Sequence, residues 1–186
     1  MLREFQRVGR QLLQLGLITS HGGNASVRKG DYVYITCHMA MLGDLEKGNV
    51  VKVSFSHKDP SKTANVSKEY SVHREIYETT GADAVIHAHP VHAVALSLVR
   101  EVIKPLDAEG MTMVGDVPVI ATCEVAEAVG NRQVAKAVAE ALKKWRVVMV
   151  KGHGSFAVGK TLEEALCYTS ALEDSSKIIL TLGKQR

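Results

Sequence analysis

Hydrophobic and polar positions along this chain follow two periods, one typical of helices and the other typical of strands. Near the start, Leu2, Phe5, Leu12 and Leu15 recur at multiples of three and four residues, and Gly16 follows them. Side chains with that spacing share one face of an α-helix, and glycine is common just after a helix end. The pattern therefore predicts an amphipathic helix that ends at Gly16.

Three short β-rich runs come next, and turn residues separate the first two. Ala25–Arg28 and Tyr32–Thr36 flank the sequence Lys29-Gly30-Asp31, which predicts a hairpin. Val50–Phe55 alternates apolar and polar side chains and predicts a third strand. The polar, proline-containing stretch 56–64 predicts a loop.

Helices and strands mix in the remainder of the chain without strict alternation. Further strands are predicted at Ala84–Ala88, Val102–Lys104, Val117–Ile120, Val147–Val150 and Ser155–Val158. Further helices are predicted at 67–81, from Pro90 onward, at Glu124–Lys144 with an interruption at Gly130-Asn131, and from a Thr161/Glu164 capping box to about Leu182. This mixture favours an α/β fold in which helices cover the faces of a mixed, mainly antiparallel sheet. No linker, composition shift or internal repeat divides the chain, so we expect residues 1–186 to form a single domain.

The composition is that of a globular protein and weighs against several classes of function. Of the 186 residues 46% are hydrophobic and 23% charged, the net charge is +3, and basic residues do not interleave with aromatic ones, which argues against nucleic-acid binding. Cys37, Cys123 and Cys167 are far apart and odd in number, which indicates a reducing compartment. Because the N-terminal stretch is charged and no apolar run reaches membrane-spanning length, we expect a cytoplasmic protein without a signal peptide.

Three histidines interrupt the apolar sequence VIHAHPVHAV. His87 and His89 are two residues apart, so on a strand they lie on the same face at its C-terminal end, where two imidazoles can bind one metal ion. The competing interpretation is a pair of half-buried rings bonded to water and loop carbonyls. We expect His92, in the following helix, to pack locally or behind the ligands, and His73, on the same helix face as Glu69, to lie behind the ligands rather than to bind the metal.

Two further segments carry candidate site residues. His153 follows the apolar run VVMV and stands between Gly152 and Gly154, where the chain can turn sharply. A third neutral imidazole would complete three metal ligands and leave one position open, as in catalytic zinc sites; a plain turn histidine is the alternative. Ser67 is the expected N-cap of its helix, which puts Glu69 in the first turn, with a solvated surface glutamate as the alternative.

Four short motifs extend over most of the chain. GGNASVR, SKEYSVH, HAHP and KGHG stand at residues 22–28, 67–73, 87–90 and 151–154. In this order and at these distances they resemble the class II aldolase/adducin family, from the first helix to the last. The resemblance implies an α/β/α sandwich and, for the family's aldolases, homotetramers with active sites between subunits.

The resemblance also assigns the catalytic side chains. His87, His89 and His153 match the family's zinc ligands, and Glu69 matches the glutamate that serves as acid and base beside the metal. Retro-aldol cleavage leaves negative charge on a carbonyl-derived oxygen, which a zinc ion held by neutral histidines would stabilise while Glu69 moves a proton to the carbanion carbon. This ligand set favours zinc over non-haem iron, with manganese, iron and cobalt as the other candidates.

A site for the substrate phosphate is implied in the first two motifs. Gly23, Asn24 and Ser67 match the family residues that bind the phosphate, and a helix N-terminus at Ser67 would supply N–H groups. Lys68 would add a positive charge, the alternative being an ordinary solvated lysine.

The chain departs from the family's aldolases in three places. After the second strand the family has a Thr/Ser-Gly pair that contacts phosphate, whereas this chain has ITCHMAML. The loop KPLDAEGMTMVG contains no tyrosine, so Asp107 or Glu109 is the candidate proton donor, unless both are exposed loop acids. GKQR follows the last helix, so we expect no tail that carries a second tyrosine. These departures leave the native substrate open, including whether it is phosphorylated.

The sequence thus predicts a zinc-dependent aldolase that cleaves or forms a carbon–carbon bond in a small phosphorylated ketose, giving dihydroxyacetone phosphate and an aldehyde. A sugar-phosphate dehydratase, epimerase or decarboxylase of the same family is the alternative, although the family's epimerases carry aspartate at the position of Glu69. A non-catalytic, adducin-like assembly module is a third interpretation, and it would be expected to lack metal-binding side chains.

Overall fold

The structure is a computed structural model that describes residues 1–56, 65–121 and 131–183. Within these residues the centre of the molecule is an eight-stranded sheet with the order β3-β2-β1-β4-β8-β7-β6-β5. The strands are β1 (Asn24–Lys29), β2 (Tyr32–Thr36), β3 (Val50–Ser54), β4 (Ala84–Ala88), β5 (Val102–Ile103), β6 (Val117–Ile120), β7 (Val147–Val150) and β8 (Gly154–Gly159). Neighbouring strands are antiparallel except β6 and β7, which are parallel, so the predicted mixed, mainly antiparallel sheet is confirmed.

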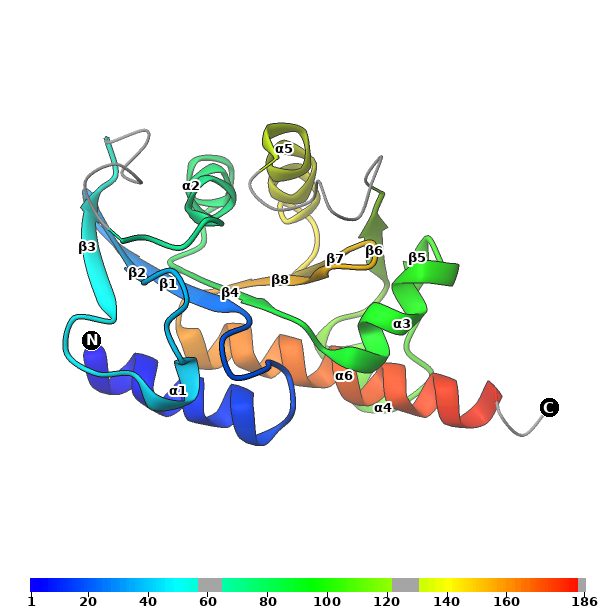
Figure 1. The fold of residues 1–186 in the computed structure, drawn as a ribbon. Helices are drawn as coiled ribbons and strands as arrows, with labels where there is room; N and C mark the ends of the chain where they lie inside the picture. Colours follow the sequence, from blue (N-terminus) through cyan, green and yellow to red (C-terminus); the bar gives the residue numbers. More distant parts are fainter. Residues whose placement is uncertain (57–64, 122–130, 184–186) are drawn as a thin grey trace.

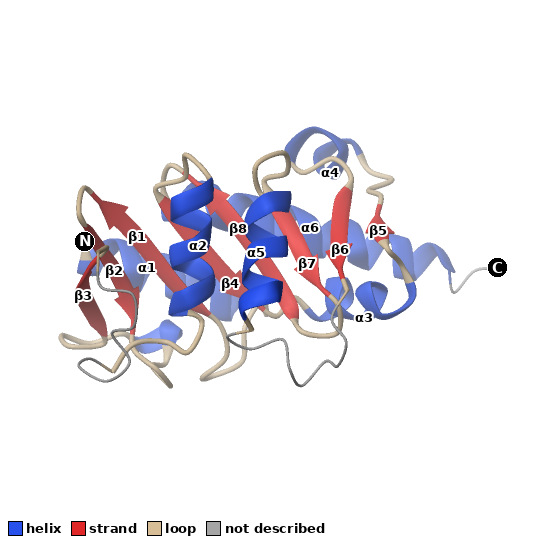
Figure 2. Ribbon diagram, turned by 90° about the horizontal axis from the view of Figure 1, so that it is seen from above, coloured by secondary structure: helices blue, strands red, loops and turns tan. Residues whose placement is uncertain are grey.

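Helices cover both faces of the sheet and give the molecule three layers (Figure 1). One face carries α2 (Tyr70–Thr79) and α5 (Arg132–Ala141). The other face carries α1 (Leu2–Gln14), α3 (Val91–Val99), α4 (Ala108–Met113) and the long α6 (Leu162–Gly183). Seen from above, α2 and α5 lie in front of the central strands and α6 runs behind them (Figure 2). The predicted α/β/α sandwich is therefore the observed architecture.

Each face of the sheet has its own apolar core, and β4 contributes to both. All five residues of β4 are buried, and successive side chains point to opposite faces. Ile86 packs in the core under α1 and α6, whereas Val85 packs in the core under α2 and α5. By the same alternation His87 lies on the α2 side, as does Phe156 of β8, its cross-strand neighbour. The imidazole of His87 therefore lies in the layer between the sheet and α2.

The strands predicted from the sequence are all present, with ends that differ by at most one residue, but several helices differ from the prediction. The helix expected from Ser67 begins at Tyr70, with Glu69 in the N-cap position. The reason is a tight turn: the Ser67 hydroxyl accepts a hydrogen bond from the Glu69 N–H (3.2 Å), and the Ser67 carbonyl accepts one from the Tyr70 N–H (3.1 Å). Glu69 therefore stands at the helix entrance rather than in its first turn.

One further helical segment corrects the prediction, and another begins where an interruption was predicted. The glycine-containing loop before β6 contains α4, because the Asp107 carboxylate accepts a hydrogen bond from the Gly110 N–H (2.8 Å) and caps a helix there. At Asn131 the expected interruption is a helix start: its side-chain oxygen accepts hydrogen bonds from the N–H groups of Gln133 and Val134. The expected helical residues 124–130, the loop residues 57–64 and Cys123 lie outside the described residues. Among the helices that are described, none combines the length and apolar character needed to cross a bilayer.

Candidate metal centre

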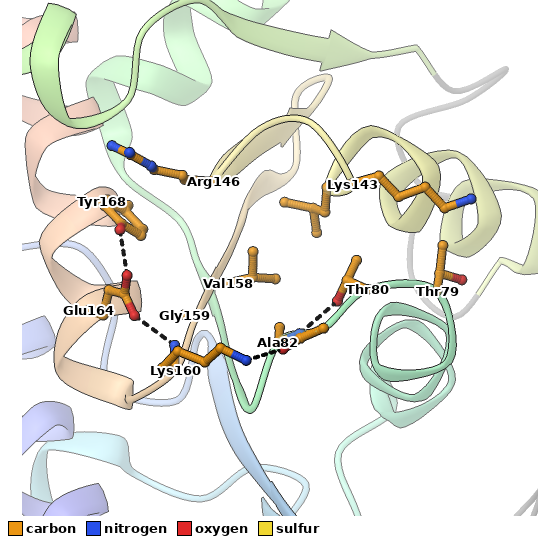
Figure 3. Close-up of a pocket in the computed structure, with 12 residues that line it drawn as sticks. Thr79, Thr80, Ala82, Lys143, Arg146, Val158, Gly159, Lys160, Glu164 and Tyr168 are labelled. Carbon is orange, nitrogen blue, oxygen red and sulfur yellow. Dashed lines mark hydrogen bonds between the residues drawn. The ribbon is translucent and has the colours of Figure 1, made fainter.

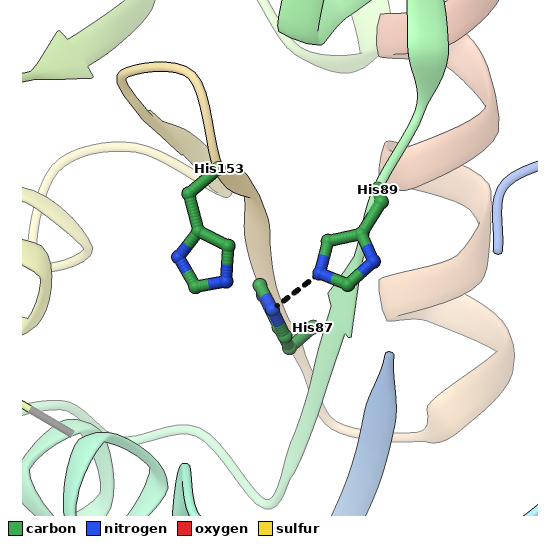
Figure 4. A group of neighbouring side chains, drawn as sticks. All are labelled: His87, His89 and His153. Atoms are coloured by element: carbon green, nitrogen blue, oxygen red, sulfur yellow. Dashed lines mark hydrogen bonds between the residues drawn. The ribbon is translucent and has the colours of Figure 1, made fainter. Parts of the chain in front are cut away.

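Three histidines from two chain segments meet at one end of the central strands (Figure 4). His87 lies near the end of β4, His89 directly after it, and His153 in the turn between β7 and β8. Because β4 and β8 are antiparallel neighbours, the end of β4 meets the start of β8. One ring nitrogen from each of the three histidines can be chosen so that all lie within 4.8 Å of one another. The Nε2 atoms of His87 and His89 are 3.0 Å apart.

The orientation of the His87 ring is set by two neighbours on β8. Its Nδ1–H donates to the Ser155 carbonyl (2.9 Å), and its ring stacks on Phe156 with a centroid distance of 4.3 Å and an interplanar angle of 21°. A neutral imidazole that donates through Nδ1 has its lone pair on Nε2. The lone pair of His87 therefore points toward His89, as a metal ligand requires.

The close approach of the rings depends on glycine at position 154. A Cβ at Gly154 would lie 2.4 Å from the Ala88 carbonyl oxygen, 2.7 Å from Cδ2 of His89 and 3.0 Å from Cε1 of His87. Gly152 on the other side of His153 has a φ of 67°, which glycine adopts without strain. Both glycines that flank His153 are thus needed by the geometry of the turn.

The electrostatic environment keeps all three rings neutral near pH 7. Burial, and then the nearby His89 and His153 rings, lower the pKa of His87 well below its ordinary value. Burial lowers the pKa of His153 to about 4, with His89 as the second cause, and burial also lowers the pKa of His89. Neutral imidazoles are the form that binds divalent transition metals. The donor set therefore fits such an ion.

The Glu69 carboxylate borders this group. Its side chain is buried, and Oε1 lies 3.8 Å from Nε2 of His153. The hydrogen bond from its backbone N–H to the Ser67 hydroxyl holds Glu69 in the turn before α2. A carboxylate at this distance can bind a metal held by the histidines or exchange a proton with a substrate bound there.

The predicted phosphate-binding residues divide into two groups. Asn24 pairs with His87 across β1 and β4, and its buried Oδ1 has no hydrogen-bond partner among the described residues. Gly23 precedes it with a φ of 77°, and a Cβ there would lie 2.8 Å from the His87 carbonyl oxygen. Ser67 is buried nearby, whereas Lys68 is exposed. Gly23, Asn24 and Ser67 thus reach the histidine end of the sheet, and Lys68 lies on the surface.

Thr36 joins these segments and was missed by the sequence analysis. Its hydroxyl accepts a hydrogen bond from the Ala25 N–H (3.2 Å), and its carbonyl accepts one from the Ser67 N–H (3.2 Å). The residue therefore connects β1 and the turn before α2 to the end of β2. In the sequence, Thr36 is only a threonine at the end of a predicted strand, and that position has no specific chemical meaning by itself.

Glu173 of α6 was missed as well. Its buried carboxylate accepts hydrogen bonds from the backbone N–H groups of His92 and Ala93 (3.1–3.2 Å) and lies 2.7 Å from Nδ1 of His92. It therefore caps the N-terminus of α3, the helix that follows His89, from another part of the chain. The His92 ring is therefore paired with a residue of α6.

The two acids that replace the family's loop tyrosine have other surroundings. Asp107 caps α4 through its carboxylate, and Glu109 is exposed. Both observations favour the interpretation of these residues as loop acids.

A cavity of about 410 Å³ opens at the opposite end of β4 and β8 (Figure 3). Its basic side chains already have contacts: Lys143 pairs with Glu140 (2.7 Å), and Lys160 donates to the Gly81 carbonyl (2.6 Å). Arg146 likewise donates to a backbone carbonyl (2.6 Å). Each of these cations already has an acceptor within the protein, so the cavity gives no specific indication of an anion site.

Comparisons with known proteins show which family the chain resembles. A model of the family described as Class II Aldolase and Adducin N-terminal domain matches residues 3–180. Among solved structures, the L-fuculose-1-phosphate aldolase from Thermus thermophilus superimposes with a TM-score of 0.92 and 36% identity, over 99% of this chain and 94% of that chain.

Curated relatives fall into more than one reaction class. The 3-oxo-tetronate 4-phosphate decarboxylase from Cupriavidus necator is 30% identical over 96% of this chain and 83% of its own length. The L-fuculose phosphate aldolase from Methanocaldococcus jannaschii is 26% identical over 96% of this chain and 94% of its own length. Similarity alone therefore does not select one reaction.

Proposed function

Because this chain belongs to the class II aldolase and adducin family, we propose that it is a metal-dependent aldolase. Its substrate would be a small phosphorylated ketose, cleaved to dihydroxyacetone phosphate and an aldehyde. The observation that carries the proposal is the group of three histidine nitrogens within 4.8 Å of one another, with a buried carboxylate oxygen 3.8 Å from Nε2 of His153. The 36% identity to a fuculose-1-phosphate aldolase over 99% of this chain favours the aldolase branch of the family.

His87, His89 and His153 would hold the ion, and we propose zinc. Three histidine nitrogens that leave a coordination position open are typical of catalytic zinc sites. When bound, the ion supplies positive charge that stabilises the negative charge developing on the substrate's carbonyl oxygen. The Ser155 carbonyl fixes the tautomer of His87, so that this ring is oriented before any metal arrives.

Glu69 would move the proton that the reaction requires. As the bond between the two carbons breaks, its electron pair passes toward the carbonyl oxygen, and the carbon next to the carbonyl must receive a proton. We assign the protonation of this carbon to the Glu69 carboxyl group. The hydroxyl proton on the carbon that becomes the aldehyde would pass to water at the site. Gly23, Asn24 and Ser67 would bind the phosphate through N–H and side-chain groups, with Lys68 adding charge at the surface.

Decarboxylation of a phosphorylated 3-oxo acid is the second candidate. Relatives with this activity in their names are 28% and 30% identical to this chain. Loss of carbon dioxide also sends an electron pair toward a neighbouring carbonyl and also needs protonation of the remaining carbon. It requires no acceptor for a hydroxyl proton, which agrees with the loop KPLDAEGMTMVG containing no tyrosine.

One experiment separates the two reactions. The zinc-loaded protein is incubated with dihydroxyacetone phosphate and glycolaldehyde, acetaldehyde or lactaldehyde, and in parallel with 3-oxo-tetronate 4-phosphate, while NMR follows the products. We expect a new carbon–carbon bond with at least one aldehyde, and loss of activity after chelation with EDTA. Release of carbon dioxide without any aldol product would instead establish the decarboxylase.

We also propose that the active enzyme is a homo-oligomer, most simply a tetramer. Val91, Leu98 and Val99 expose apolar side chains on α3, which begins just after His89. Exposed apolar surface of this kind is typical of subunit interfaces. Light scattering during gel filtration would measure the mass, and Leu98→Lys should lower it. A monomeric wild-type protein would contradict the proposal.

Two expectations about the chain as a whole remain proposals. We propose that residues 1–186 form one domain, because both apolar cores pack on the same sheet. We propose the cytoplasm as its location, which agrees with free thiols at Cys37 and Cys167.

A further inference from the structure

Three polar side chains form a hydrogen-bonded chain inside the apolar layer between α2 and the sheet. The hydroxyl of Tyr77 lies 2.7 Å from the Ser26 hydroxyl, and the Ser26 hydroxyl lies 2.7 Å from Nδ1 of His73. All three residues are at most 2% exposed, and apolar side chains such as Val72 and Ile76 surround them in the same core. Unpaired polar groups at this depth cost free energy, so these two hydrogen bonds favour one arrangement of α2 on β1.

This chain connects the helix of Glu69 to the strand beside the metal ligands. His73 follows Glu69 by one helical turn, and its backbone N–H donates to the Glu69 carbonyl (3.1 Å). Ser26 belongs to β1, where Asn24, two residues earlier, is the cross-strand partner of His87. A shift of α2 along the sheet would therefore break the hydrogen bond between His73 and Ser26.

The His73 ring also contacts the ring that supports His87. It lies edge-on to Phe156, with centroids 6.1 Å apart and planes at 76°, and Phe156 stacks on His87. Nε2 of His73 is buried and has no hydrogen-bond partner among the residues that the structure describes. An apolar side chain would avoid this unpaired nitrogen, so packing alone does not explain a histidine here.

We propose that His73 is a positioning residue that holds the first turn of α2 at the depth where the Glu69 carboxylate meets His153 and the substrate. The proposal rests on the proposed role of Glu69 as the proton-transferring group. His73 acts through Glu69 and does not itself touch the metal or the substrate. Since a displacement of about 1 Å at a reacting group can lower a rate about 100-fold, a directional hydrogen bond at this point has a large effect on turnover.

Three variants of α2 test the proposal. His73→Leu fills the space but removes the hydrogen bond to Ser26; His73→Asn restores a polar group near the position of Nδ1; Ile76→Val is a packing control on the same helix face. For each variant kcat, KM, zinc affinity and the free energy of unfolding are measured, and the crystal structure of the zinc-loaded protein is determined.

His73→Leu should fold and bind zinc within about 3-fold of wild type, with KM nearly unchanged and kcat lowered about 10- to 100-fold. His73→Asn should recover most of that loss, and Ile76→Val should behave as wild type. In the crystal structure of His73→Leu the Glu69 carboxylate should move by about 1 Å or more relative to His153.

Unchanged kcat and an unmoved Glu69 in His73→Leu would overturn the proposal. Equal losses of zinc affinity, stability and kcat in both His73 variants would also overturn it, because they would show a purely structural role. If the wild-type protein turned over none of the substrates, the proposed function would fail, while the position of Glu69 in the crystal structures would still decide whether His73 holds it.

Discussion

At the residue scale, the main constraint on the candidate metal centre is space. His87 and His89 lie so close to the start of β8 that only a hydrogen atom fits where residue 154 would carry a side chain. At the same time, burial keeps the rings neutral, so crowding does not bring positive charges together. The site therefore combines tight packing with uncharged nitrogen donors.

We expect Gly154→Ala to weaken metal binding at least 10-fold and to lower the free energy of unfolding by about 1–3 kcal/mol, because the added methyl group must displace the Ala88 carbonyl or the imidazoles. Calorimetric titration with zinc and urea denaturation measure the two effects. Gly81→Ala is the matched control, since a Cβ there meets no atom within 4 Å. Wild-type zinc affinity in Gly154→Ala would contradict the inferred crowding.

His153→Ala and Glu69→Gln should have different effects, because we assign them different roles. Removing the imidazole should lower zinc affinity by at least about 100-fold, since a neutral nitrogen donor is lost. Glu69→Gln should retain zinc but lose about 10²- to 10⁴-fold in turnover. Metal analysis after dialysis and steady-state rates measure these effects. Full activity of Glu69→Gln would remove the acid/base assignment.

At the element scale, helix ends set the positions of the site residues. Ser67 turns the chain before α2 and places Glu69 at the helix entrance, while Glu173 caps α3 behind His89. Ser67 Oγ accepts a hydrogen bond from the Glu69 N–H in the turn before α2, whereas the Glu173 carboxylate accepts hydrogen bonds from N–H groups that the start of α3 leaves unpaired. The helices are thereby fixed where they meet the end of β4.

We expect Glu173→Ala to lower the free energy of unfolding by about 1–3 kcal/mol, because the N–H groups of His92 and Ala93 lose a buried acceptor. Glu173→Gln, which keeps one oxygen, should cost less. Glu163→Ala on the same helix removes only an exposed pair with Arg7 and should cost less than about 0.5 kcal/mol. Urea denaturation of the three variants would refute the capping role if Glu173→Ala and Glu163→Ala were equal.

At the scale of the whole molecule, stability should depend on pH through histidines that the fold buries in neutral form. Burial lowers the pKa of His73 from 6.5 to about 3. Between these values the unfolded chain binds a proton that the native protein does not, so this residue makes the native protein less stable as the pH falls from 6.5 toward 3.

The stability of wild type should therefore fall about 1.4 kcal/mol per pH unit more steeply than that of His73→Asn between about pH 6 and pH 4. Urea denaturation at several pH values, in the presence of EDTA, measures this difference. The comparison of the two proteins cancels the contributions of His87, His89 and His153. Parallel curves would show that His73 is protonated in the native state.

The strands and helices could be predicted where their ends are marked by residues close together in the sequence. The strand ends were placed within one residue because alternation and turn residues are properties of neighbouring positions. Helix starts were less accurate: Ser67 does act as a hydrogen-bond acceptor, but it closes a turn before the helix rather than the helix itself. Asp107 showed no signal that distinguishes a cap from a loop acid, because its hydrogen bond to Gly110 forms only once α4 exists.

The sequence by itself determined the mixed sheet, its flanking helices and the paired positions of His87 and His89, because these follow from periods of two and of three to four residues. Only the tertiary structure decided that β8 lies beside β4 and brings His153 to the same point, and that Ser26 reaches His73 beneath α2. These contacts join positions far apart in the chain, and the free energy that selects them comes from packing two apolar cores on one sheet, which no local pattern records.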